Sequence, residues 1–383
     1  MKKTLLLIFL LCVSLLLSAC TATDPDNLFE MPEGTTESTA VGTESTEATH
    51  KEFVNYTGTY PYGNVQDTAS FGFMLLDNEV VFSHLRNQHF WMYAYDLNTE
   101  EVHYYCDDAT CKHNSCVSAD FFSNIEVYDG KLYGTVWSMA DPLSDYVAEA
   151  KGNDTEIILD GAVLNFYHHD DKLYVRTADN SLAVLEEGAN EVQILMEEFI
   201  GTYYVIFDDY LYFQVLNGNP DDTKYGRIHL TEENPQAEIL LSKVLGRTDG
   251  EYIYYLDKIN AGGLGIYGYL CRCNLDGSNP ERLTKEKIGG FNFDEEYIYY
   301  QNIVNMQTYK REKARDIYRF PKSDPTQVEK IATMPGAVGM IYTVPGTGKL
   351  FVLKFWEDGS KEDVYYVMNT DGSDIKQLEL PED

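Results

Sequence analysis

The stretch TDGEYIYYLD, residues 248–257, places a turn signal directly before a short run of aromatic and β-branched residues. A closely similar stretch, FDEEYIYYQN, returns at 293–302. Tyrosine and isoleucine favour strands because their side chains pack well on a pleated, half-buried surface. Asp-Gly favours tight turns. Each stretch therefore predicts a turn that leads into one β-strand.

The same unit recurs along the chain. Its other copies are LDNEVVFSH at 76–84, YDGKLYGTV at 128–136, HDDKLYVRT at 169–177, FDDYLYFQV at 207–215 and PGTGKLFVLK at 345–354. An aromatic residue marks each copy: Phe82, Tyr133, Tyr174, Tyr212, Tyr254, Tyr299 and Phe351. These markers are 38 to 52 residues apart, a repeat typical of a β-propeller with four strands per blade. We expect an all-β chain with seven four-stranded blades, and counts of six or eight remain open.

Two Asp-Gly-Ser turns, at Asp276 and Asp371, follow their marker aromatics at similar distances. Asp-Gly supplies the positive φ that hairpin turns require, so we expect these turns to join the third and fourth strands of a blade. A reading as calcium loops is less favoured, because the acidic positions and the distal glutamate of an EF-hand are missing.

TDGEYIYYLD resembles the YWTD blades of low-density-lipoprotein-receptor propellers, with Tyr255 for Trp and Leu256 for Thr. The turns NLDGSN and NTDGSD resemble those propellers and TolB-like ones. As a whole, the chain is similar to bacterial propeller lipoproteins of the clostridial type. The likeness covers residues 70–383 in rhythm and the last three blades in motif. It implies a toroid that presents loops for binding, and it implies no chemistry.

The N-terminus has the pattern of a secretory signal. Lys2 and Lys3 precede an apolar run from Leu5 to Leu17, which is shorter than the roughly 20 residues of a membrane span. The run ends at Leu-Ser-Ala-Cys, which resembles the lipobox of bacterial lipoproteins, where the cysteine is acylated. We expect a signal peptide at 1–19 and a lipidated, for example palmitoylated, Cys20. The lipid would be the only membrane anchor of an extracytoplasmic, surface-exposed protein.

Residues 21–51 contain eight threonines and five glutamates and few apolar residues. Such a composition cannot offset the entropy cost of ordering, so we expect residues 20–51 to form a disordered tether of the lipidated cysteine. The β-propeller then occupies 52–383. The segment 52–65 is expected to supply a strand that closes the last blade.

The chain is strongly acidic, with a formal net charge of −33 at pH 7. Loss of residues 1–19 removes two lysines and no acid and changes this charge to −35. Binding to phosphates depends on lysine and arginine side chains that displace counterions. The charge therefore excludes a nucleic-acid partner.

Five cysteines remain after the signal peptide and Cys20, so they cannot all be paired within one chain. Cys271 and Cys273 are two residues apart in an expected strand and share a face. They align with Tyr366 and Met368 of the last repeat. Because these counterparts are large and apolar, we expect both cysteines to be buried packing residues.

The stretch CDDATCKHNSC, residues 106–116, contains Cys106, Cys111, His113 and Cys116. These are four soft ligands, the number that a closed tetrahedral zinc site uses. A disulfide between two of the cysteines is an alternative, since exported chains meet oxidising surroundings. The third possibility is a loop that has neither a zinc ion nor a disulfide. Both zinc and a disulfide would be structural, and no other cofactor is indicated.

His168 and His169 are expected to belong to a turn rather than to a metal site, because adjacent strand residues face opposite ways. No serine elbow, zincin helix or phosphate-binding loop occurs in the sequence. We therefore expect a non-enzymatic binding or scaffold lipoprotein, a monomer, that engages a glycan, a peptide or an envelope protein through propeller loops or the central channel. The alternative is a surface hydrolase or lyase that acts on polysaccharide with channel carboxylates.

Overall fold

The computed structural model describes residues 72–381 apart from 87–88, 107, 109, 114–115, 117–121, 137–145, 153, 162, 190, 202, 217–219, 263–264, 303–315, 337 and 355–363. The chain divides into two compact units, Met1–Asn55 and Tyr56–Asp383, and every described residue belongs to the second. The expected signal peptide, Cys20, the tether and the closing strand at 52–65 lie outside the described residues. Within the described part, no helix is long and apolar enough to cross a membrane.

The all-β prediction is confirmed. The described elements are 27 strands and one short 3-10 helix, η2 (Pro220–Asp222). The strands form five four-stranded sheets and one seven-stranded sheet. All paired neighbours are antiparallel, from β1 to β27.

Each four-stranded sheet is one blade made of consecutive strands. Blade 1 contains β1 (Phe73–Leu76), β2 (Glu79–Arg86), β3 (His89–Asp96) and β4 (Val102–Tyr104). Blade 2 contains β5 (Phe122–Tyr128), β6 (Lys131–Val136), β7 (Tyr146–Lys151) and β8 (Asp154–Asp160). Blade 3 contains β9 (Val163–His169), β10 (Lys172–Thr177), β11 (Leu182–Leu185) and β12 (Gln193–Met196). Blade 4 contains β13 (Tyr203–Phe207), β14 (Tyr210–Val215), β15 (Lys224–His229) and β16 (Glu238–Ser242). Blade 7 contains β24 (Val338–Val344), β25 (Lys349–Lys354), β26 (Val364–Asn369) and β27 (Lys376–Gln377).

The seven-stranded sheet contains blades 5 and 6. Its strands are β17 (Leu245–Thr248), β18 (Tyr252–Gly262), β19 (Gly265–Asn274), β20 (Glu281–Phe293), β21 (Tyr297–Asn302), β22 (Asp316–Pro321) and β23 (Glu329–Thr333). The long strand β20 belongs to both blades. Near its start Arg282 pairs with Cys271 of β19, and near its end Phe291 pairs with Tyr300 of β21. Counted in this way, the described residues form seven four-stranded units, in agreement with the seven repeats.

The marker aromatics all lie on the second strands of their blades and are buried. In six blades the marker is the third residue of that strand, but Phe82 is the fourth residue of β2. The alignment of the first repeat is therefore wrong by one residue, and the structurally equivalent position is Val81. A shift of one residue turns a side chain to the other face of a strand, so Phe82 points toward blade 7.

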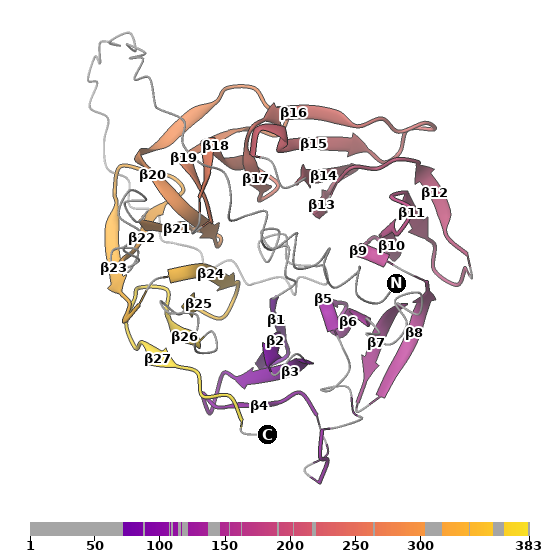
Figure 1. The fold of residues 1–383 in the computed structure, drawn as a ribbon, viewed down its shortest axis with the longest axis horizontal. Helices are drawn as coiled ribbons and strands as arrows, with labels where there is room; N and C mark the ends of the chain where they lie inside the picture. Colours follow the sequence, from indigo (N-terminus) through magenta and orange to yellow (C-terminus); the bar gives the residue numbers. More distant parts are fainter. Residues whose placement is uncertain are drawn as a thin grey trace, which may run out of the picture. The chain divides into compact units, whose positions relative to one another are not determined.

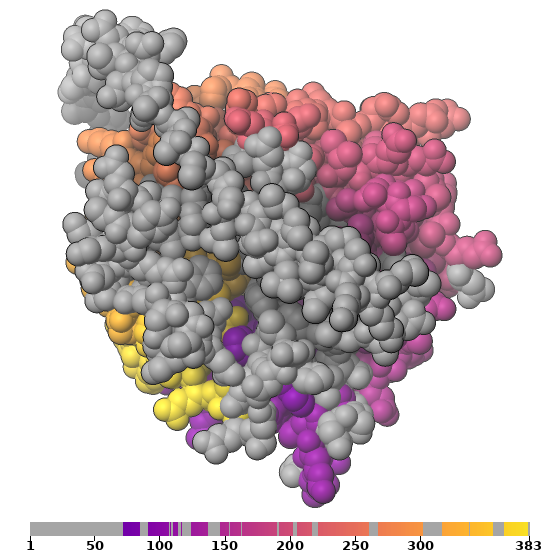
Figure 2. Space-filling model, viewed as in Figure 1, coloured from indigo at the N-terminus to yellow at the C-terminus, as the bar shows by residue number. Residues whose placement is uncertain are grey.

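The blades follow the sequence around a central axis, with the first strand of each blade nearest the centre and the fourth at the rim (Figure 1). The hydrophobic core lies between the blades. Six clusters of buried side chains join blade 1 to 2, 2 to 3, 3 to 4 and 5, 5 to 6, 6 to 7, and 7 back to 1. The ring is thus closed by packing within the described residues, and the yellow C-terminal blade lies beside the purple N-terminal one (Figure 2).

Both Asp-Gly-Ser turns join a third to a fourth strand, as predicted. Gly277 and Gly372 have φ of 79° and 82°. The carboxylate oxygen of Asp276 accepts hydrogen bonds from the amide (2.9 Å) and hydroxyl (2.5 Å) of Ser278. Asp371 binds Ser373 in the same way. These carboxylates therefore serve the turn.

Three arginines repeat at one position of the third strand in blades 4, 5 and 6. Arg227, Arg272 and Arg319 each pair with a glutamate of the fourth strand, at 2.7, 2.8 and 3.1 Å. Each guanidinium also donates to a backbone carbonyl in the following blade: those of Leu275, Lys322 and Thr370. Each arginine therefore links two neighbouring blades.

Because antiparallel strands alternate in direction, connections from second to third strands open on the same face of the ring as connections between blades. We call this the loop face. The described strand ends that flank the four longest connections, 105–121, 137–145, 303–315 and 355–363, all lie on this face.

Candidate metal centre

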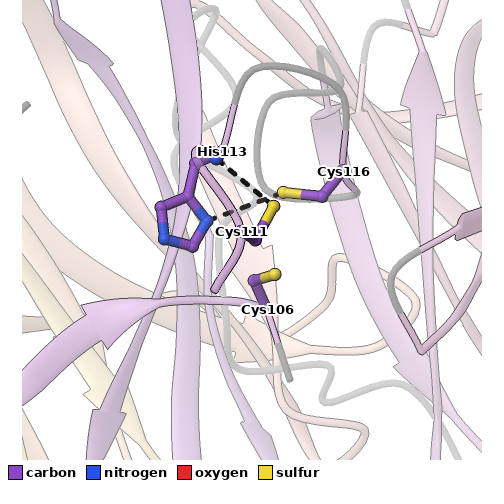
Figure 3. A group of neighbouring side chains, drawn as sticks. All are labelled: Cys106, Cys111, His113 and Cys116. Carbon is purple, nitrogen blue, oxygen red and sulfur yellow. Dashed lines mark hydrogen bonds between the residues drawn. The ribbon is translucent and has the colours of Figure 1, made fainter. Parts of the chain in front are cut away.

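The cluster predicted from CDDATCKHNSC lies on the loop face, in the connection from β4 to β5. The structure brings all four expected ligands together. The sulfur atoms of Cys106, Cys111 and Cys116 and a ring nitrogen of His113 lie within 4.8 Å of one another. Figure 3 shows the four side chains directed toward a common point. In the described part of the chain, this is the one group of this kind.

A tight turn brings Cys111 back toward Cys106. The amide of Cys111 donates to the carbonyl of Asp108 at 2.9 Å. The Asp108 carboxylate accepts bonds from the hydroxyl and amide of Thr110, at 2.7 and 2.8 Å, and these bonds lower the pKa of Asp108. His113 has a φ of 52°, in the left-handed region. This backbone conformation turns the chain so that a histidine only two residues after Cys111 can face the same centre.

The separations fit a tetrahedral ion. Zn–S bonds of 2.3 Å and Zn–N bonds of 2.0–2.1 Å place neighbouring ligand atoms about 3.6 to 3.8 Å apart in a tetrahedron. Nδ1 of His113 lies 3.7 Å from Sγ of Cys116. The widest separation in the group, at most 4.8 Å, requires a contraction of about 1 Å. The four residues can therefore hold a metal ion.

Neighbouring groups support the ligands. The amide of His113 donates to Sγ of Cys111 at 3.3 Å, a bond that stabilises a thiolate. The imidazole of His113 stacks on the ring of Tyr104 with centroids 4.3 Å apart and planes 26° apart. Cys116 is buried, with 5% of its surface exposed, and the other three ligands are partly buried. Thiolates and an imidazole form a donor set that prefers zinc over magnesium or calcium.

All five described cysteines are free thiols in this structure. Cys271 and Cys273 are buried among apolar side chains between blades 3, 4 and 5, as predicted. Burial raises the pKa of Cys271 to about 12 and that of Cys273 to about 11. Both therefore act as packing residues and lie outside the cluster.

The two adjacent histidines end strand β9, and the turn itself consists of Asp170 and Asp171. The prediction that they belong to the turn is therefore wrong in detail. His168 is buried and bonds through Nδ1 to the carboxylate of Glu126 at 2.8 Å, in blade 2. His169 faces the other way, and its Nε2 lies 3.1 Å from the carbonyl oxygen of Asp208 in blade 4. They do not converge on one ion, as expected from their spacing.

The link between Glu126 and His168 was missed in the sequence. Glu126 accepts a second bond from the amide of His168, at 2.9 Å. The imidazole lies between the rings of Tyr128 and Tyr133, at 4.9 and 4.2 Å. The partners are 42 residues apart, so only the alignment of neighbouring blades could have indicated the pair.

The loop face also contains a cavity of about 630 Å³ between blades 3 and 4. Its lining includes two cationic side chains, Arg176 and Lys224, three acidic ones, Asp179, Glu198 and Asp222, and the half-exposed Ile200. This volume lies within the range of small-molecule and peptide sites. Nothing in the sequence repeats indicates this cavity, because its residues come from irregular connections.

Comparisons with solved structures identify the architecture. A puromycin-hydrolysing peptidase of Mycobacterium tuberculosis matches with 8% identity and a TM-score of 0.55, over 83% of this chain and 54% of the peptidase. The β-propeller domain of the Trilobed protease from Pyrococcus furiosus matches with 11% identity and a TM-score of 0.50, over 82% of this chain and 98% of that domain. The tricorn protease matches with 11% identity and a TM-score of 0.37, over 77% of this chain and 30% of its own.

The chain thus spans about half of the peptidase and about a third of the tricorn protease. No family model matches the chain, and no curated protein matches it. At these identities the likeness concerns the fold alone. The chain is an all-β propeller built from four-stranded blades.

Proposed function

We propose that this protein is a non-enzymatic binding or scaffold module that engages its partner through the loop face. The observation that carries the proposal is the cavity between blades 3 and 4 on that face, where the described strand ends that flank the longest connections also lie. Loops held by a rigid scaffold are the usual place for binding residues in folds of this kind. The partner is a glycan, a peptide or an envelope protein, bound by a monomer.

Two features favour a peptide among these partners. The cavity is lined by the guanidinium of Arg176 and the ammonium of Lys224 and by three carboxylates, so side chains of opposite charge are present for both termini of a short peptide. Ile200, 49% exposed, supplies an apolar contact at the same place. Pockets of this kind combine apolar surface with a few polar groups that fix orientation.

The buried carboxylates of the described residues support a non-enzymatic reading. Glu126 is held by His168, and Glu149 lies 3.5 Å from the ammonium of Lys131 and 3.7 Å from that of Lys151. A glycoside hydrolase or lyase needs carboxylates directed at its substrate. Since both groups have partners within blades 2 and 3, the polysaccharide-degrading alternative is less favoured.

The test compares two exposed isoleucines of the blade 3 region. The full chain is incubated with envelope extract, and bound peptides, proteins and glycans are measured. We expect Ile200→Glu to abolish retention, because it places a charge in the cavity. Ile194→Glu alters a side chain on the rim strand β12 that is 51% exposed, and should retain binding. Hydrolysis of a polysaccharide by the wild-type chain, or equal retention by both variants, would contradict the proposal.

We also propose that the chain is an extracytoplasmic lipoprotein anchored only through lipid on Cys20, with residues 20–51 as its tether. A flexible chain of this length spans about 30 Å, enough to hold the ring clear of the membrane. Metabolic labelling with palmitate should mark the wild-type chain and not Cys20→Ser. Labelling of the variant, or recovery of wild type in the soluble fraction, would count against the anchor.

For the cluster of Cys106, Cys111, His113 and Cys116 we propose one zinc ion with a structural role. Four protein ligands leave no open position for substrate or water, which is the arrangement of structural rather than catalytic zinc sites. Metal content is measured by native mass spectrometry of the chain purified without oxygen. One zinc per chain that is lost in Cys111→Ser supports the site, and a mass lower by two protons, the signature of a disulfide, contradicts it.

A further inference from the structure

We infer that zinc in this cluster stabilises the joint that closes the ring, between blade 1 and blade 7. The inference rests on the zinc proposed above and extends it, because the ring on which His113 stacks, Tyr104, packs against the hydrophobic cluster of that joint. Two observations carry it: an unbroken series of contacting aromatic rings that leads from His113 to blade 7, which we call the stack, and the composition of the closing joint itself.

The stack begins at the metal ligand. His113 stacks on Tyr104 at 4.3 Å, and Tyr104 stacks on Tyr93 at 5.2 Å with planes 28° apart. Tyr93 contacts Phe82 at 5.7 Å, where the one-residue shift in β2 has turned this ring toward blade 7. From there the stack continues through Phe73, 4.7 Å from Phe82.

Phe73 is the last ring of blade 1, and it stacks on Phe351 of blade 7 at 4.6 Å. It also meets the edge of Tyr365 at 5.3 Å. Phe82 and Phe351 are completely buried and Phe73 is 2% exposed. Closely packed interiors transmit displacement because they contain little free space. The position of the His113 ring is therefore coupled through direct contacts to the closing joint.

Three other joints have a link that the closing joint lacks among the described residues. Blades 4 to 5, 5 to 6 and 6 to 7 are each joined by an interblade arginine. The equivalent residue of blade 7 is Val367, which pairs with Phe351 as Arg319 pairs with Tyr299. Blades 5 and 6 also share β20, whereas blades 1 and 7 are made of separate strands in the described part.

Two ion pairs at this joint share one residue. Glu100 of blade 1 binds Lys349 of blade 7 at 3.0 Å and also contacts Lys376. Lys349 is 14% exposed and Glu100 29%, so this pair contributes to the joint, whereas the contact with the half-exposed Lys376 contributes little. The joint therefore depends on its aromatic side chains together with the ion pair of Glu100 and Lys349, and a group that holds those aromatic side chains in place strengthens the closure.

Zinc would act on the weakest element of that stack. Tyr104 lies on β4, which has only three residues and pairs with β3 alone. Short outer strands open readily. A zinc-bound imidazole has a fixed plane, so the ion would hold His113 against Tyr104 and Tyr104 against Tyr93. Without the ion, His113 is no longer held by a bond to the metal, and Tyr104 loses a fixed neighbour.

The experiment is hydrogen exchange of the full chain, loaded with one equivalent of zinc and then stripped with a chelator under reducing conditions. We expect removal of zinc to raise the amide hydrogen-exchange rates of β1 and β25 about tenfold, a change within the range typical of coupled sites. Exchange in β14 and β18, on the far side of the ring, should change much less. Cys273→Ser, a buried cysteine outside the cluster, serves as the control and should keep the zinc response.

The decisive variant is Tyr104→Leu. It leaves all four ligands in place, so it should still bind one zinc, but exchange in β1 and β25 should no longer depend on the ion. A simple loss of packing would raise exchange with and without zinc equally and leave the response intact, which would overturn the inference.

The remaining outcomes separate the two proposals. If the chain binds zinc but stripping changes exchange only within 102–116, the zinc site stands and the coupling to closure is wrong. If the reduced chain binds no zinc, both are wrong. Retention of envelope ligands is measured independently of either result, so failure of the binding function is recognised separately.

Discussion

At the scale of single residues, each interblade arginine makes several different contacts with one side chain. Arg319 lies 4.5 Å from the centre of the Tyr297 ring, pairs with Glu329 at 3.1 Å and donates to the carbonyl of Thr370 at 2.8 Å. A planar guanidinium can serve a carboxylate, a ring and a carbonyl at once, and a lysine ammonium cannot do so equally well. The repeated use of arginine here follows from that geometry.

We expect Arg319→Ala to lower the free energy of unfolding by about 2 kcal/mol, since it removes charged hydrogen bonds from a side chain that is only 14% exposed. Glu329→Gln, at a side chain 54% exposed, should cost less than about 1 kcal/mol. Urea unfolding measures both. Equal losses would show that the ion pair, and not the bond to blade 7, is the stabilising contact.

The buried thiols give a second prediction at this scale. Burial raises the pKa of Cys271 to about 12 and that of Cys273 to about 11, against an ordinary 9.0. Only thiolates react with iodoacetamide, so neither residue should be alkylated in the folded chain at pH 8. Mass spectrometry after alkylation in urea should find both modified. Rapid labelling of Cys273 in the folded chain would contradict the assigned burial.

Some of these residues could be predicted from the sequence and others could not. The burial of Cys271 and Cys273 follows from the bulky residues at the aligned positions of the last repeat. The role of Arg319 was not recognised, because its acceptor is a backbone carbonyl in the next blade and a backbone atom leaves no trace in the sequence. The misalignment of the first repeat at Phe82 also has a physical cause. Val81 and Phe82 are both apolar, so either residue satisfies the repeat pattern.

At the scale of elements, two matched turns respond differently to the same change. Gly277 and Gly372 both have φ near 80°. A Cβ on Gly277 would meet Leu240 at 3.4 Å, an ordinary contact, whereas on Gly372 it would lie 2.1 Å from the carbonyl oxygen of Ile331 in β23. The second turn is therefore pressed against the neighbouring blade.

We expect Gly277→Ala to cost about 1 kcal/mol, the usual penalty for a side chain in the left-handed region. Gly372→Ala should cost at least ~2 kcal/mol more, because the backbone of blade 6 or blade 7 must move. Thermal unfolding of both variants gives the comparison. Similar melting temperatures would mean that the turn at Gly372 relaxes without strain.

The elements themselves were largely predictable, because turn residues and alternating aromatics are local signals. The sharing of β20 between blades was not. The markers Tyr254 and Tyr299 are 45 residues apart, close to the other intervals, so the spacing gives no sign of a merged strand. The register shift between Ile288 and Phe291 encloses Gly289 and Gly290, and this pair is the local signal that indicates a bend there.

At the scale of the whole molecule, buried tyrosines make the fold sensitive to alkali. Burial raises the pKa of Tyr95 and of Tyr300 from 10.0 to about 12. A folded group with a raised pKa holds its proton while the unfolded chain loses it. The stability it contributes is therefore complete below pH 10 and is lost as the pH rises toward 12.

We expect the urea midpoint to be constant from pH 8 to 9 and to fall steeply above pH 10. Tyr95→Phe tests the cause. The hydroxyl of Tyr95 is buried and has no hydrogen-bond partner among the described residues, so the variant should be as stable as wild type at pH 7. It should also lose less stability above pH 10. Parallel curves for the two proteins would assign the alkaline loss to other groups.

The ring of blades as a whole could be predicted, because each sequence repeat indicates one blade. Its closure could not, since the residues expected to close it, 52–65, lie outside the described range and the contacts that do close it join Phe73 to Phe351. These residues are far apart in the sequence, and no local pattern connects them. The metal ligands were identified from their spacing, but their convergence required the turn at Asp108 and the conformation of His113.

The shared strand β20 has a consequence for dividing the chain. A cut at 243–244, between β16 and β17, leaves every blade whole in one of two fragments, which can then reassociate through complementary faces. No such site exists between blades 5 and 6, because a cut there must fall inside β20. One fragment would then contain an incomplete sheet with unpaired backbone groups. We therefore expect that blades 5 and 6 can be exchanged or deleted only as a pair, and that a split reporter built on this propeller should be divided at another joint.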